Sequence, residues 1–115
     1  MLVDFHDKRF FVVYNPCKVK LECRELDSIL RTKHNLDIFD GNFYITISKD
    51  NKTLQVTYWE KNGFCTWRKK IFKDSFPKPR DDKGIKEINF EEFKMLLEGI
   101  DFFRKHESIA IKNFY

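Results

Sequence analysis

Hydrophobic and polar side chains alternate along two segments, residues 42–48 and residues 53–59. This alternation predicts strands with one buried face. A third segment, residues 64–72, follows Asn62-Gly63, a pair typical of a type I′ turn because both central residues need positive φ. The pattern therefore predicts a meander of antiparallel strands. The side chains expected to face the core are Phe43, Ile45, Ile47, Leu54, Val56 and Tyr58.

Two other segments repeat their apolar residues at helical spacing. Residues 21–31 predict one helix that fades near residues 33–35. A second helix is expected to follow Asn89, whose side chain can cap it, with Glu91 and Glu92 near its positive end. Gly99 is expected to stop or bend this helix. Its apolar stripe comprises Phe90, Phe93, Leu96, Leu97 and Ile100.

The remaining segments complete a predicted order of β-α-β-β-β-(β)-α. Residues 9–14 form a short apolar run that predicts a buried strand ending before Pro16. Residues 77–84 are an extended loop, and residues 85–88 form a short edge strand. We expect one α+β domain over residues 1–115, with residues 104–115 as a C-terminal tail. Its antiparallel sheet would have three to five strands, with both main helices packed on one face.

Composition narrows the class of protein. The chain has 115 residues, of which 42% are hydrophobic and 35% are charged, values typical of a single folded domain. No apolar run approaches the roughly 18 residues of a membrane span. The first residues lack the basic and apolar regions of a signal peptide, and the three Cys cannot all pair with one another. We therefore expect a cytoplasmic protein with reduced thiols and no membrane partner.

Positive charge is concentrated in one part of the chain. The whole chain carries a net charge of +4, whereas residues 64–80 alone carry six basic residues and one acid. Such a density suits phosphate backbones or acidic partners, although a solvated, lysine-rich strand end gives the same pattern. Lys outnumbers Arg 16 to 6, which favours phosphate contacts over bidentate reading of bases.

The sheet face opposite the core residues supplies two candidate binding surfaces. On the third strand this face holds either Thr66, Arg68 and Lys70 or Trp67 and Lys69, because the pattern leaves its register open. The candidate DNA-binding residues are Tyr44, Gln55, Thr57, Arg68, Lys69, Lys70, Lys73, Lys78 and Arg80. A candidate protein interface comprises the aromatic residues Trp59, Phe64, Trp67 and Phe76.

Catalytic motifs are not found in the sequence. It has no glycine-rich phosphate loop, no nucleophile elbow and no zinc motif. Asp37, Asp40 and Glu60 could serve a metal-dependent nuclease, but Asp at a turn usually bonds its own backbone. We therefore expect a protein that is not an enzyme and that needs no metal or cofactor.

Several motifs carry a family resemblance. Residues 36–45 read Leu-Asp-Ile-Phe-Asp-Gly-Asn-Phe-Tyr-Ile, residues 58–67 combine Tyr-Trp, Gly-Phe and Trp, and residues 96–101 read Leu-Leu-Glu-Gly-Ile-Asp. In these motifs the chain resembles the small accessory protein, often called TnpB, of bacterial insertion sequences of family sixty-six. The resemblance covers about residues 10–103. The residues that match well are Asp37, Phe39, Gly41, Tyr58, Trp59, Gly63, Phe64, Trp67 and Lys69.

The first helix departs from the family pattern. Members open it with Met-Arg-Lys-Ser-Phe-Asp-Gly-Leu, whereas residues 19–26 here keep one basic residue and the closing Leu. The resemblance implies a role in transposition without the catalytic step, which a separate transposase carries out. It leads us to expect an accessory protein that binds DNA at transposon ends. The alternative is a protein adaptor that binds the transposase or self-associates without contacting DNA.

Overall fold

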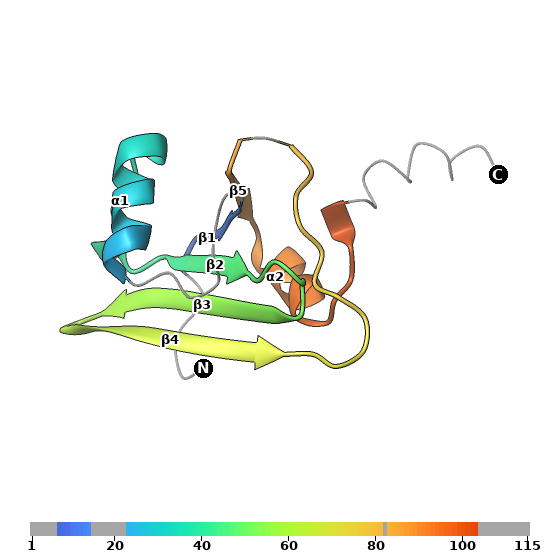
Figure 1. Cartoon of the computed structure of the whole chain (residues 1–115). Helices are drawn as coiled ribbons and strands as arrows, with labels where there is room; N and C mark the ends of the chain where they lie inside the picture. Colours follow the sequence, from blue (N-terminus) through green and yellow to red (C-terminus); the bar gives the residue numbers. More distant parts are fainter. Residues whose placement is uncertain (1–6, 15–22, 82, 104–115) are drawn as a thin grey trace.

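The chain forms one sheet with two main helices, and the computed structural model describes residues 7–14, 23–81 and 83–103 (Figure 1). This arrangement confirms the α+β class, the meander and both helices. Pro16 and the C-terminal tail lie outside the described residues. The elements are β1 (Phe10–Val13), α1 (Cys23–His34), the short 3-10 helix η1 (Ile38–Asp40), β2 (Phe43–Ile47), β3 (Thr53–Glu60), β4 (Gly63–Lys70), β5 (Ile85–Ile88) and α2 (Phe90–Leu97).

The five strands are arranged in the order β4-β3-β2-β1-β5. β1 lies between β2 and β5, with Phe10 paired to Phe43 on one side and to Ile88 on the other. It runs parallel to β2 and antiparallel to β5, so the sheet is mixed and not wholly antiparallel as expected. The parallel pair is possible because the connection from β1 to β2 contains α1 and is long enough to cross over.

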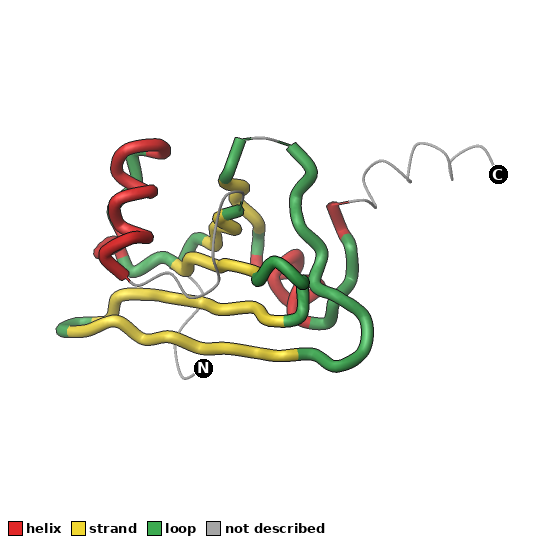
Figure 2. Tube along the Cα trace, viewed as in Figure 1, coloured by secondary structure: helices red, strands yellow, loops and turns green. Residues whose placement is uncertain are grey.

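The two helices cover opposite faces of the sheet, which differs from the expectation that both cover one face. Every residue of β1 is buried, so both faces of this strand need cover. Phe10 and Val12 belong to the core on the α2 side, whereas Phe11 and Val13 pack with residues of α1. In Figure 2, α1 stands above the strands, whereas α2 lies near their other end and overlaps them in this view.

Aromatic side chains build the larger core, on the α2 side. The ring of Phe10 lies 5.1 Å from that of Phe43 and 4.8 Å from that of Phe93. Leu96 of α2 and Phe102, which follows the helix, are also buried in this core. The six side chains expected to face inward from the meander all belong to it, which confirms that part of the pattern: Phe43, Ile45, Ile47, Leu54, Val56 and Tyr58.

A smaller core lies under α1. Leu26 and Leu30 of the helix pack with Ile38 of η1 and with Tyr44 of β2. The ring of Tyr44 also stacks on that of Phe11, with 5.5 Å between the centroids. This core covers β1 and β2 on the face that the sequence analysis treated as open.

The β3–β4 hairpin forms, but its turn lies one residue earlier than predicted. Glu60 pairs with Gly63, so Lys61 and Asn62 make the turn, and Lys61 has a φ of 52°. This register places Trp59 opposite Phe64, with their rings 5.0 Å apart in a T-shaped contact. A turn centred on Asn62-Gly63 would pair Trp59 with Thr66 and would lose that aromatic pair.

Both ends of α2 are capped. Asn89 and Glu92 form a reciprocal capping box, which confirms the predicted start of the helix. Gly99 follows the helix with a φ of 79°, as a stop signal requires. The Nζ of Lys69 on β4 donates to the carbonyl of Leu97 at 2.7 Å. A strand residue thus satisfies one of the last carbonyls of the helix and places a positive charge at its negative end.

Within the described ranges, no helix is both long enough and apolar enough to cross a membrane.

Candidate nucleic-acid interface

β4 is an edge strand, and its register settles which of its side chains share a face. Gln55 pairs with Arg68 and Thr53 pairs with Lys70, so Arg68 and Lys70 lie on the same side of the sheet as α1. Both are exposed, as is Thr66. Trp67 and Lys69 point to the opposite face. We call Arg68 and Lys70 the basic stripe.

Hydrogen bonds hold one end of the basic stripe in place. The Nε of Arg68 donates to the Oε1 of Gln55 at 2.7 Å, and the Nε2 of Gln55 reaches Thr57 at 3.4 Å. Among the residues that the structure describes, no carboxylate forms an ion pair with Arg68 or Lys70. Both charges are therefore free to meet an external anion.

The carboxylate of Asp50 interacts electrostatically with Lys70 of the basic stripe. The pKa of Asp50 lies below its usual value, first because the Ser48 hydroxyl donates to it and then because the backbone N–H of Lys52 does. The charge of Lys70 lowers the pKa of this carboxyl further. Asp50 is thus engaged with its own turn, between β2 and β3, and stays ionised at neutral pH.

Three residues of the predicted DNA-binding set are buried and cannot reach DNA. Gln55 and Thr57 are buried on β3, and Gln55 accepts the hydrogen bond that orients Arg68. Tyr44 is covered by α1, and its hydroxyl donates to the Oδ2 of Asp40 at 2.6 Å. The pKa of Tyr44 is raised, mainly because the hydroxyl is buried and also because it donates to the Asp40 carboxylate. The prediction was wrong for these three because Tyr, Gln and Thr suit either a wet face or a polar contact within the fold.

The remaining predicted cations are dispersed. Lys69 lies on the α2 face, where it caps that helix. The guanidinium of Arg80 bonds Asp101 at 3.1 Å, and Lys78 is half-buried. Lys73 is exposed in the loop after β4, three residues beyond Lys70.

The same loop contains a residue that the sequence analysis missed. Phe72 is 87% exposed, the highest value of any large hydrophobic residue described. The sequence analysis placed Phe72 at the end of the third strand of the meander, residues 64–72. The alternation of side chains along a strand could have indicated its exposure. Residues 66, 68, 70 and 72 are exposed, whereas the residues between them are half-buried.

Three aromatic residues form a second, partly exposed cluster. Phe39 lies 5.1 Å from Trp59 and 5.4 Å from Phe64, measured between ring centroids, and is 45% exposed. This aromatic cluster of Phe39, Trp59 and Phe64 unites residues that carry the family resemblance. The other two predicted interface residues differ, since Phe76 is buried in the core and Trp67 packs on the opposite face.

The three carboxylates considered for a metal-dependent nuclease, Asp37, Asp40 and Glu60, are engaged in local contacts. The thiol of Cys65 donates to the Oε2 of Glu60 at 3.7 Å. Asp37 accepts from the backbone N–H of Phe39 at 3.0 Å and caps η1, and Asp40 accepts from that of Asn42 at 2.8 Å. These bonds confirm the turn roles expected for both. In the described part of the chain, no group of three or more His, Cys, Asp or Glu side chains could hold a metal ion.

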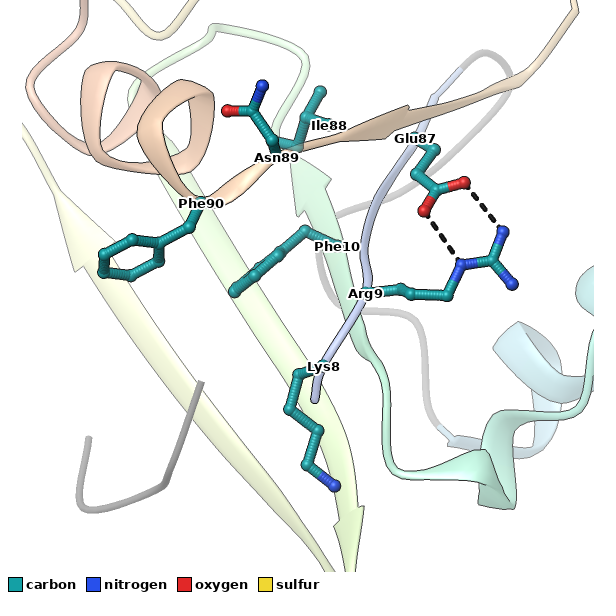
Figure 3. Close-up of a pocket in the computed structure, with 7 residues that line it drawn as sticks. All are labelled: Lys8, Arg9, Phe10, Glu87, Ile88, Asn89 and Phe90. Carbon is teal, nitrogen blue, oxygen red and sulfur yellow. Dashed lines mark hydrogen bonds and ion pairs between the residues drawn. The ribbon is translucent and has the colours of Figure 1, made fainter. Parts of the chain in front are cut away.

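A cleft of about 540 Å³ lies beside the start of β1. Figure 3 shows Arg9 and Glu87 on one side of the strand and Phe10 and Phe90 on the other. Arg9 bonds both carboxylate oxygens of Glu87, at 2.8 and 2.7 Å, and this contact lowers the pKa of Glu87. The cleft contains none of the candidate residues, and its ion pair ties Arg9, which directly precedes β1, to Glu87 of β5.

Comparison with known proteins adds one match. A family model described as "IS66 Orf2 like protein" matches residues 8–107. No curated protein and no solved structure gives a significant match.

Proposed function

Because the chain belongs to the IS66 Orf2-like family of transposition accessory proteins, we propose that it assists transposition by binding duplex DNA through its basic stripe. We also propose that it is not an enzyme, that it needs no cofactor, and that the element's transposase performs the chemistry. The DNA would be the transposon ends.

The observation that carries this proposal concerns Arg68 and Lys70, which lie on the α1 side of the edge strand β4. Both are exposed, and neither forms an ion pair with a described carboxylate. Alternate side chains on a strand lie about 7 Å apart. Each backbone of duplex DNA carries a regular row of phosphates. Two neighbouring cations on one side of a strand can therefore each contact a phosphate of one backbone.

Access to the stripe supports the same proposal. In Figure 1, α1 stands over the hairpin end of β3 and β4, whereas the carboxyl end of β4 points away from it. Arg68 and Lys70 lie near that carboxyl end. A double helix could thus approach the stripe without meeting α1.

We expect Arg68→Ala combined with Lys70→Ala to weaken DNA binding and its salt dependence. Each lost phosphate contact lowers the slope of log affinity against log salt by about one, so the double variant should lower it by about two. The measurement is fluorescence anisotropy of a labelled duplex with the terminal repeat, over a salt series. A scrambled duplex shows whether the protein prefers the repeat.

The matched control is Lys33→Ala combined with Lys86→Ala, which removes the same charge at exposed positions on α1 and β5. This control should bind like the unmodified protein. An unchanged slope in the stripe variant, or an equal loss in the control, would place the contact elsewhere.

The aromatic cluster favours a second candidate function, a protein adaptor for the transposase. Phe39, Trp59 and Phe64 form a half-exposed apolar surface of the kind that anchors protein interfaces. Co-purification with the transposase that survives nuclease and high salt would support this candidate over DNA binding.

A further inference from the structure

Phe72 is presented to solvent immediately after the basic stripe. Its neighbour Ile71 packs against the core on the α2 side, and Phe72 itself is 87% exposed. Single exposed apolar residues are common on proteins, but a Phe ring so fully exposed leaves a large apolar area in water. The ring is therefore available to an external partner.

The loop that carries Phe72 is braced on both sides. The backbone N–H of Ile71 donates to the carbonyl of Lys52 at 2.9 Å, and that of Phe76 donates to the carbonyl of Asn51 at 2.7 Å. The Nζ of Lys52 also bonds the carbonyl of Asp74, which has a φ of 62°. These bonds fix the loop on both sides of Phe72 against the β2–β3 turn.

The charges around the ring indicate the kind of partner. Lys70 precedes Phe72 by two residues, and Lys73 follows it directly. Both are exposed, and neither forms an ion pair with any described carboxylate. The exposed Asp74 lies two residues beyond Phe72, so the two cations outnumber the one carboxylate in this segment. Flanking cations suit a polyanion with apolar surfaces inside it, and duplex DNA has phosphates outside and stacked bases within.

We propose that Phe72 inserts between two base pairs of the duplex that the basic stripe holds, and so kinks it. This inference rests on the proposed function and deepens it. Apolar side chains, Phe among them, act as wedges in proteins that bend DNA, and the kink brings more backbone onto the protein surface. Lys70 and Lys73 would hold the phosphates that flank the opened step.

The test measures unstacking and bending separately from affinity. A duplex with 2-aminopurine at successive positions reports unstacking by a rise in fluorescence, and a duplex with dyes at its two ends reports bending by energy transfer. The unmodified protein should raise both signals. Phe72→Ala should abolish both and lower affinity about tenfold, at the lower end of what an aromatic–base stack contributes. Its salt slope should not change, because the cations remain.

The control is Phe90→Ala, which removes an exposed ring at the cleft on the far side of the sheet. This variant should unstack and bend DNA like the unmodified protein. If Phe72→Ala still bends the duplex, the wedge is wrong while the proposed function stands. If the unmodified protein binds no duplex at all, both are wrong. If Phe72→Ala bends DNA normally but loses the transposase, the ring is a protein contact.

Discussion

Replacing Phe10 with Ala should lower the free energy of unfolding by about 3–5 kcal/mol. Phe10 is 2% exposed and contacts the rings of Phe43 and Phe93, so its removal leaves a cavity between β1, β2 and α2. A domain of this size is usually stable by only about 5–15 kcal/mol. The variant should therefore lose a large share of its stability.

Urea denaturation followed by circular dichroism measures this loss, and Phe72→Ala is its matched control. The control deletes the same side chain from a site that is 87% exposed. It should change stability by less than about 0.5 kcal/mol. Equal losses in both variants would contradict the core described for the α2 side.

Replacing Leu30 with Ala should cost about 2–5 kcal/mol, because Leu30 anchors α1 to the other face of the sheet. Its side chain is fully buried with Leu26, Ile38 and Tyr44. Without it, α1 loses its central contact with β2 and η1. Thermal unfolding followed by circular dichroism measures the change.

Arg24→Ala is the control for α1, since Arg24 is exposed in the first turn of the same helix. It should change stability by less than about 0.5 kcal/mol. A small effect of Leu30→Ala would mean that α1 does not pack on the sheet in solution.

Local signals predicted most of the elements. The alternation in residues 42–48 and 53–59 depends only on neighbours in sequence, as does the cap at Asn89. The position of β1 could not be read in this way. The run Phe10–Val13 is apolar on both faces, and its pairing with β2 and β5 depends on residues far along the chain.

The candidate site was predicted in part, for related reasons. Parity along β4 indicated Arg68 and Lys70 as one of two options, and the register of β4 against β3 selected it. Tyr44 and Phe76 were misplaced because nothing in their own segments shows what covers them. Tyr44 lies beneath α1, and Phe76 is drawn into the core by a loop bonded to Asn51.

The position of β1 between β2 and β5 has a consequence for how the chain folds. Partners in the β3–β4 hairpin are between 3 residues (Glu60 and Gly63) and 17 residues (Thr53 and Lys70) apart in sequence. The pair of Phe10 and Ile88 spans 78 residues. The entropy lost on closing a loop grows with its length, so the hairpin can assemble early. β5 can join only once β1 has docked, and until then both edges of β1 are open to pairing with another chain.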